Sequence, residues 1–384
     1  MNKFNPRKTK YLKLVDKVLK IFFHTKKAKD KIAWDEINNI LILDTHGIGD
    51  VIMLIPFLKT LKNNSPQASV DLLCMPYSKD ILDDQGYIDQ FIFINGLRDI
   101  ENIKYMILHS PRLVKKILEI RKKQYDVIIE PKGDIRYLFF MHFLKGKRKI
   151  SYNCTGGEQF LTDVVSPNDK ITHLIDDKLY LLQEIGCNVD EKDRTPSLKA
   201  GRECRAYVDS FLEQHNPSGK FTVGIHPGAS MEIKRWDKYC DLIESMGDKY
   251  HDVFFMIFCT KEDADIKDQM EAACKKMGAD YAIVEESFRN YFRLISACDL
   301  FIGNDSGGAH IAAAYGIPIV EVFGPVEPSS SKPYGKEVNI MSLSKDCKPC
   351  HSSICLKGDI ECIRDISCGS VLSVVEHYIQ KGKR

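Results

Sequence analysis

The stretch Leu41-Ile-Leu-Asp-Thr-His-Gly-Ile-Gly-Asp50 decides the fold predicted for the first half of the chain. Its apolar start is typical of a buried strand, and its two glycines predict a tight turn into a helix. Such a turn lets backbone N–H groups approach a ligand. A dinucleotide-binding G-x-G-x-x-G motif would need a third glycine where this chain has Ile52. An NAD-dependent oxidoreductase is therefore disfavoured.

The acid that closes this turn, Asp50, has two interpretations. A carboxylate would repel a pyrophosphate, but it can take a proton from a hydroxyl and so act as a general base. Alternatively, Asp50 caps the helix of an ordinary Rossmann-type turn. The turn alone leaves both interpretations open.

Size and composition limit the class of protein. A chain of 384 residues exceeds one typical domain, so two are expected. The net charge of +2 argues against a nucleic-acid partner for the chain as a whole. No apolar run is long enough to span a bilayer. The 13 cysteines lie mostly singly in apolar surroundings, as in a reducing cytoplasm, which is the predicted location.

The first residues are strongly basic. Between Lys3 and Lys31 there are eleven Lys or Arg and only two acidic residues. One predicted helical face carries the apolar side chains Leu12, Val15, Leu19 and Phe22. A basic amphipathic helix suits the inner, anionic face of a membrane, whereas the alternative is a helix packed on the body of the protein. We predict membrane contact.

Short apolar runs alternate with amphipathic segments through both halves, which predicts parallel sheets covered by helices. The predicted strands are residues 39–43, 69–74, 90–94, 127–130, 221–226, 253–259, 300–303 and 319–323. The predicted helices are residues 50–63, 110–123, 176–185, 236–250, 262–276, 291–297 and 306–315. The fold class is α/β, with two doubly wound, Rossmann-like domains that face each other across a cleft.

We predict four segments. Residues 1–36 are a basic N-terminal segment, 37–200 an N-terminal Rossmann-like domain, 201–340 a C-terminal Rossmann-like domain, and 341–384 a Cys-rich tail with a C-terminal helix.

A second motif, Asp305-Ser-Gly-Gly-Ala-His310, follows a predicted strand and opens a helix. Free N–H groups at a helix start suit an anion, and Gly307 and Gly308 let phosphate reach the backbone. Ser306 adds a hydroxyl donor. Because Asp305 would repel phosphate, a sugar hydroxyl is its expected partner. The alternative is that Asp305 caps the helix and His310 packs in the core.

A third motif, His226-Pro-Gly-Ala-Ser230, also follows a strand, and Lys234-Arg-Trp236 comes soon after it. Lys234 is suited to a leaving diphosphate, to which Ser230 would donate a hydrogen bond. A different pair, Asp263 and Asp265, imitates a metal-binding D-x-D motif. We interpret that pair as the solvated surface of a helix.

Together these motifs resemble the heptosyltransferases of glycosyltransferase family 9, which transfer heptose from ADP-heptose during lipopolysaccharide core assembly. The resemblance runs from about Asn39 to about Tyr378, and the order of its motifs is specific. Its matching pieces are Gly47-Ile-Gly-Asp50 with Pro56, Tyr125-Asp-Val-Ile-Ile129 with Arg136, His226-Pro-Gly-Ala229 with Lys234-Arg-Trp236, Asp305-Ser-Gly-Gly-Ala-His310, Gly316-Ile-Pro318 and Phe323-Gly-Pro325.

The resemblance implies a GT-B fold and an inverting glycosyltransferase whose chemistry needs no metal. Residues 37–200 would form its acceptor domain and residues 201–340 its nucleotide-sugar donor domain. It implies that Asp50 is the catalytic base and that the donor is bound by Ser230, Lys234, Asp305, Ser306, Gly307, Gly308 and His310. His46, Gly49 and Arg136 would lie on the acceptor side. The implied partners are a nucleotide-sugar donor, most simply ADP-heptose, and a lipid-linked or glycan acceptor.

Two further questions stay open. Cys347, Cys350, Cys355 and Cys362 have the spacing C-x2-C-x4-C-x6-C, which is acceptable for a structural Zn or Fe site, while reduced thiols or a disulfide are the alternatives. The chain could also be a sugar-nucleotide-binding protein without transfer activity, or use another nucleotide sugar or a protein acceptor. A transferase requires Asp50 as a base, whereas a binding protein without transfer activity does not.

Overall fold

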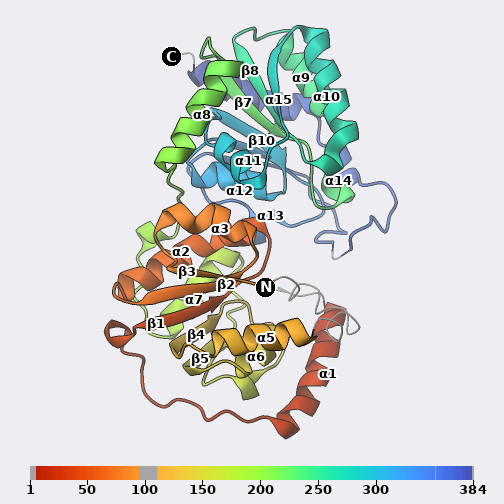
Figure 1. Cartoon of the computed structure of the whole chain (residues 1–384). Helices are drawn as coiled ribbons and strands as arrows, with labels where there is room; N and C mark the ends of the chain where they lie inside the picture. The colour runs from red at the N-terminus through yellow and green to blue at the C-terminus, as the bar shows by residue number, and fades with distance from the viewer. Residues whose placement is uncertain (1–5, 95–109, 351, 383–384) are drawn as a thin grey trace. The chain divides into compact units, whose positions relative to one another are not determined.

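The chain divides into two units, Met1–Arg194 and Thr195–Arg384, in a computed structural model (Figure 1). The structure describes residues 6–94, 110–350 and 352–382. The first five residues of the predicted basic segment therefore lie outside it. Each unit contains one six-stranded sheet in which the paired strands run parallel.

Unit 1 is a Rossmann-like sheet with the strand order β3-β2-β1-β4-β5-β6. The strands are β1 (Asn39–Leu43), β2 (Ser69–Cys74), β3 (Gln90–Phe93), β4 (Tyr125–Glu130), β5 (Gly146–Tyr152) and β6 (Asp163–Val165). The helices are α1 (Pro6–Phe22), α2 (Ile48–Asn64), α3 (Tyr77–Leu82), α5 (Ser110–Ile120), α6 (Ile135–His142) and α7 (Leu174–Glu184). Helices α2 and α7 pack together, and α5 and α6 lie on the other side of the sheet (Figure 1).

Unit 2 repeats this topology. Its order is β12-β11-β10-β7-β8-β9, which is the same winding read from the other edge. The strands are β7 (Phe221–His226), β8 (Val253–Phe258), β9 (Asp280–Val284), β10 (Leu300–Asn304), β11 (Ile319–Phe323) and β12 (Val338–Ser342). The helices are α8 (Arg202–His215), α9 (Tyr239–Gly247), α10 (Ala264–Met277), α11 (Phe288–Ile295), α12 (Gly307–Ala314), α13 (Pro328–Ser331), α14 (Glu361–Arg364) and α15 (Cys368–Gly382).

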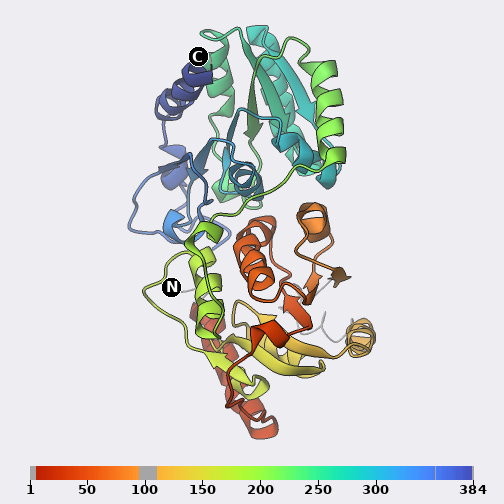
Figure 2. The ribbon, with the colours of Figure 1, turned by 90° about the vertical axis from the view of Figure 1, so that its left-hand side faces the viewer.

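The sheets form because their central strands are continuous apolar runs. Residues Ile40 to Leu43 of β1 and all of β8 are buried, as expected of strands that are covered on both faces. The end of the chain belongs to the core of unit 2, where Val371, Val375 and Ile379 of α15 are fully buried. Figure 2 shows α15 running along its unit as one of its outer helices.

This winding fixes where a ligand site is expected. In both units the strand order reverses between two neighbouring strands, β1 and β4 in unit 1 and β7 and β10 in unit 2. Ligands of doubly wound sheets bind beyond the carboxyl ends of the strands at this reversal. The motif residues follow β1, β7 and β10, so each motif begins at such a point.

Candidate active site

Asp50 lies in the first turn of α2, directly after β1. The N-cap of α2 is Gly47, not Asp50, so the interpretation of Asp50 as the helix cap is wrong. Its carboxylate lies 3.7 Å from Nζ of Lys132, and both side chains are about one-fifth exposed, at 22% and 18%. Lys132 follows β4, so the pair joins the two strands at the reversal of the sheet. The carboxylate is near solvent yet held by a cation.

The charges around Asp50 keep it ionised. Burial raises the pKa of Asp50, but attraction to Lys132, His46 and Lys178 outweighs it, so its pKa lies below the ordinary value. The carboxyl is therefore charged at neutral pH and can accept a proton.

A buried acid, Asp44, organises this end of β1. Its Oδ1 lies 2.9 Å from Nδ1 of His46, and its Oδ2 lies 3.8 Å from Nζ of Lys178 on α7. Burial raises the pKa of Asp44, but attraction to Lys178 and His46 lowers it by more, so that its pKa lies below the ordinary value. Asp44 thus positions His46.

The other residues predicted on the acceptor side lie in different surroundings. Gly49 is in the first turn of α2, next to Asp50. Arg136, in the first turn of α6, is held by Asp134, with Nε to Oδ1 at 2.9 Å and Nη2 to Oδ2 at 2.5 Å. Asp134 also caps α6 through the backbone N–H of Arg136. This ion pair fixes Arg136 beside the loop that carries Lys132.

In unit 2, the structure brings Lys234 and Asp305 together. Nζ of Lys234 lies 2.6 Å from Oδ2 of Asp305, and their side chains are 13% and 10% exposed. Lys234 follows β7 and Asp305 follows β10, which are the neighbours at the second reversal. Asp305 does not cap α12, because its N-cap is Ser306. The alternative with Asp305 as the cap is therefore wrong.

The start of α12 leaves one buried donor without a partner. The Ser306 hydroxyl is shielded from solvent and has no hydrogen-bond partner among the described residues. It makes no capping hydrogen bond to its own helix. An unpaired buried hydroxyl at the N-terminal end of a helix is suited to an anionic ligand.

The two glycines of this turn differ in their roles. A side chain at Gly308 would meet the Phe301 ring at 3.0 Å, so this glycine lets α12 pack closely on β10. Backbone access for phosphate, which was the only role predicted for Gly308, is therefore an incomplete explanation of this glycine. Gly307 opens the helix as its first residue. His310 is 5% exposed, and Ser230 lies exposed on its loop.

Asn304 is the structural centre of this site, and the sequence analysis did not find it. Its Oδ1 accepts hydrogen bonds from the Trp236 backbone N–H and the Tyr239 hydroxyl, both at 3.0 Å. Its Nδ2 donates to the carbonyls of Pro227 at 2.7 Å and Gly228 at 3.2 Å. One fully buried amide thus fixes the loop that carries Lys234 to the strand end that carries Asp305.

One acid in unit 2, Asp263, was misjudged from the sequence. Asp263 is not solvated surface. It is 2% exposed, accepts from Thr260 Oγ1 at 2.7 Å and lies 3.0 Å from Arg235 Nη2. It therefore caps a helix and braces the loop next to Lys234. Glu321 of β11 is fully buried, and burial together with Asp305 raises the pKa of its carboxyl well above the ordinary value.

The four tail cysteines, Cys347, Cys350, Cys355 and Cys362, line one cavity of about 30 Å³. Thiolates are ligands that suit Zn or Fe. However, no three His, Cys, Asp or Glu side chains within residues 6–94, 110–350 and 352–382 are arranged to hold an ion. The structural metal stays a prediction.

Comparisons with known proteins agree with this architecture. The family model of glycosyltransferase family 9 (heptosyltransferase) matches residues 113–360. Lipooligosaccharide heptosyltransferase 2 of Campylobacter jejuni is 22% identical over 87% of this chain and 96% of its own length. Among solved structures, Escherichia coli ADP-heptose lipopolysaccharide heptosyltransferase II has a TM-score of 0.73 at 19% identity, over 90% of this chain and all of that one.

A more distant structure is the iron-containing dodecameric glycosyltransferase TibC of enterotoxigenic Escherichia coli. Its TM-score is 0.54 at 15% identity, over 94% of this chain and 79% of that one. The structural likenesses show a shared fold. Because the family model covers well over half of the sequence, the chain belongs to glycosyltransferase family 9, the heptosyltransferase family.

Proposed function

We propose that this chain is an inverting, GT-B type heptosyltransferase that moves heptose from ADP-heptose to a glycan of a lipopolysaccharide core. The observation that carries the proposal is the placement of the motif residues. Asp50 with Lys132 stands at the sheet reversal of unit 1, and Lys234 with Asp305 and Ser306 stands at that of unit 2. Membership of the family and relatives named for this activity support it.

The proposed reaction divides its work between these two sets. Asp50 accepts the proton of the acceptor hydroxyl while the hydroxyl oxygen bonds to the anomeric carbon. The bond from that carbon to the diphosphate breaks, and the diphosphate leaves with the electron pair. Because attack and departure occur on opposite faces, the anomeric configuration inverts.

The leaving diphosphate gains negative charge, which Lys234, the Ser306 hydroxyl and the first turn of α12 would stabilise. No step requires a metal ion. Asp305 would exchange part of its contact with Lys234 for a hydroxyl of the donor sugar. His310, buried behind this turn, would support its backbone.

Binding of nucleoside diphosphates tests the donor site. Calorimetry with ADP, UDP and GDP is expected to show preferential binding of ADP, and Lys234→Ala should weaken it. Lys276→Ala, which removes an exposed lysine of α10 in the same unit, is the matched control. Equal affinity for all three nucleotides, or an unchanged affinity in Lys234→Ala, would contradict the proposed donor site.

Removing the positive charge of Lys132 beside Asp50 should change the pH dependence of the reaction. In Lys132→Met the pKa of Asp50 should rise, because the favourable charge is gone while burial, which raises it, remains. Since Asp50 works as the carboxylate, the acidic limb of the kcat/KM profile should move to higher pH. Lys147→Met, which removes an exposed lysine of β5, is the control. An acidic limb at the wild-type pH in Lys132→Met would show that Lys132 does not tune the base.

The Cys-lined cavity has a separate test. Protein purified without affinity metals should contain about one Zn or Fe per chain, and Cys347→Ser with Cys350→Ser should lose the metal and lower Tm. Cys368→Ser is the control, because Cys368 does not line the cavity. Metal-free wild-type protein with the same Tm as the double variant would mean that the thiols are simply reduced.

A further inference from the structure

One face of helix α1 packs against the rest of unit 1. Leu12, Leu19 and the following Phe23 pack against the apolar core of the unit. Phe23 lies edge-on to the rings of Phe139 and Phe160, with centroids 5.8 and 5.4 Å apart. This packed face includes much of the face that the sequence analysis assigned to a membrane. For Leu12 and Leu19 that assignment was wrong, because they pack on the core of unit 1, whereas Phe22 of the same predicted face is 73% exposed.

A buried acid locks α1 in this orientation. Asp16 is 5% exposed, and its Oδ1 accepts a hydrogen bond from the Gly157 backbone N–H at 2.8 Å and from Gln159 Nε2 at 3.1 Å. A side chain at Gly156 would collide with Asp16, so this glycine leaves room for the acid. The rotation of α1 about its axis is therefore fixed.

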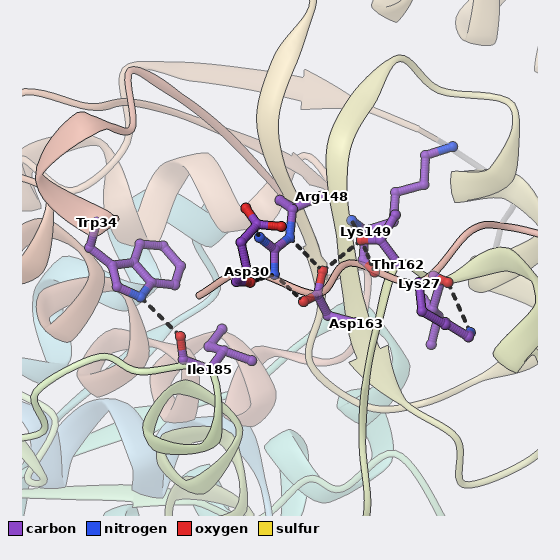
Figure 3. Close-up of polar contacts among 9 residues, drawn as sticks. Lys27, Asp30, Trp34, Arg148, Lys149, Thr162, Asp163 and Ile185 are labelled. Carbon is purple, nitrogen blue, oxygen red and sulfur yellow. Dashed lines mark hydrogen bonds and ion pairs between the residues drawn. The ribbon is translucent and has the colours of Figure 1, made fainter. Parts of the chain in front are cut away.

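The segment that follows α1 is also tied down. Nη2 of Arg148 donates to the carbonyl of Asp30 at 3.1 Å, and the Trp34 indole donates to the carbonyl of Ile185 at 3.1 Å (Figure 3). Lys27 donates to the carbonyl of Leu161 at 3.0 Å. These contacts hold the segment from Lys27 to Trp34 on unit 1, as the contacts of Asp16 hold α1 itself.

The opposite face of α1 is apolar and exposed. Leu14 is 62% exposed, and Ile21 and Phe22 are each 73% exposed. Tyr11 and Val18 complete this outer face at helical spacing. Half of the large apolar side chains that are strongly exposed within the described part of the chain lie on this one helix. Concentrated apolar exposure of this kind marks an interaction surface.

A row of lysines runs beside the outer face. Lys10, Lys13, Lys17 and Lys20 recur at the spacing of one helical face and are all exposed. The only acid on α1, Asp16, points into unit 1 and lies 3.3 Å from Nζ of Lys20. No described ion pair joins it to Lys10, Lys13 or Lys17. The helix thus presents an apolar strip next to a cationic strip.

We propose that the outer face of α1, namely Tyr11, Leu14, Val18, Ile21 and Phe22, lies in the surface of an anionic phospholipid bilayer. Apolar side chains would enter the boundary between headgroups and acyl chains while the lysines contact phosphate groups. A second copy of the chain fits less well, because pairing two such faces would bring their lysine rows together. None of the described helices is long and apolar enough to cross a bilayer, so α1 would lie along the surface.

Vesicle co-sedimentation tests this proposal with the full-length chain. Wild-type protein is expected to bind vesicles of phosphatidylcholine with phosphatidylglycerol and to bind pure phosphatidylcholine weakly. Leu14→Ser with Ile21→Ser and Phe22→Ser should lower the affinity for the anionic vesicles by about 100-fold, since three partly inserted apolar side chains are lost. Lys13→Gln with Lys17→Gln should lower it by about 30-fold, at about 1 kcal/mol per lysine.

The matched control is Val114→Ser with Leu118→Ser on α5, which removes two apolar side chains that are 53% and 59% exposed in the same unit. It should bind vesicles as the wild type does. Deleting α1 is a poorer test, because it would uncover Phe139 and Phe160. Wild-type vesicle binding in the triple variant would overturn the proposal. The proposal would also be overturned if the wild type were a dimer, the triple variant were a monomer, and neither bound lipid vesicles.

Discussion

Asp50→Asn is expected to reduce kcat by about 10²–10⁴-fold, which is the usual contribution of a positioned general base. Asparagine keeps the size of the side chain but cannot take a proton from the acceptor hydroxyl. Asp50 lies in unit 1, whereas the residues proposed to bind the diphosphate lie in unit 2. The affinity for ADP should therefore stay close to that of the wild type, so the variant separates chemistry from donor binding.

The comparison variant is Asp84→Asn, which neutralises an exposed acid of the same unit. Steady-state rates and ADP calorimetry on both variants complete the test. Wild-type turnover in Asp50→Asn would remove Asp50 from the mechanism. A large loss of ADP affinity would place it at the donor site instead.

Asn304→Ala is expected to lower the free energy of unfolding by about 3–5 kcal/mol. The substitution leaves four buried groups unpaired: the Trp236 N–H, the Tyr239 hydroxyl, and the carbonyls of Pro227 and Gly228. Each unsatisfied buried group costs about 1–3 kcal/mol, and water entering the new space recovers part of the cost. The loss should appear in urea unfolding of unit 2.

Asn339→Ala provides the control for this prediction. Its Nδ2 donates to the Ile319 carbonyl at 3.1 Å and lies 2.9 Å from the Tyr378 hydroxyl, on a half-buried strand. A smaller loss, about 1–2 kcal/mol, is expected there. Asn304→Ala should also weaken ADP binding in the folded fraction, because Lys234 is no longer held against β10. Equal stability losses in the two variants would mean that Asn304 is not the centre of the site.

The sequence predicts the central strands well because burial on both faces makes them uninterrupted apolar runs. The predicted bounds of β1, β2, β7 and β11 match the structure. By contrast, β5 begins with Gly146-Lys-Arg-Lys149, and β9 and β12 lie at sheet edges, so their apolar signal is weak. Those three strands were missed, and so was the short edge strand β6 of unit 1.

The site shows a similar division. Asp50, Lys234 and Asp305 stand in motifs that directly follow strong strands, so their placement at the carboxyl ends of the strands could be predicted. Lys132 and Lys178 are single lysines in other elements, and only the fold brings them to Asp50 and Asp44. The position of Lys132 just after a predicted strand was the one signal available for it.

Helix α1 shows what periodicity cannot decide. Spacing grouped Leu12 with Leu19 correctly but also assigned Phe22 to their face, because α1 has two apolar faces and Phe22 lies on the exposed one. Nothing in the sequence identifies which face packs on the core. The hydrogen bond from the Gly157 N–H to Asp16 fixes it in the structure. Asp263 was misjudged for a related reason, because its half-buried partner Arg235 lies well before it in the sequence.

The most direct test of the proposed function is a transfer assay that follows both the product and its configuration. The purified chain is incubated with ADP-heptose and a heptose-bearing core oligosaccharide, and the product is examined by mass spectrometry and NMR. The account predicts an acceptor that carries one additional heptosyl residue, linked with inverted anomeric configuration, in the presence of a metal chelator. Retained configuration, or ADP-heptose binding without transfer to any core acceptor tried, would contradict it.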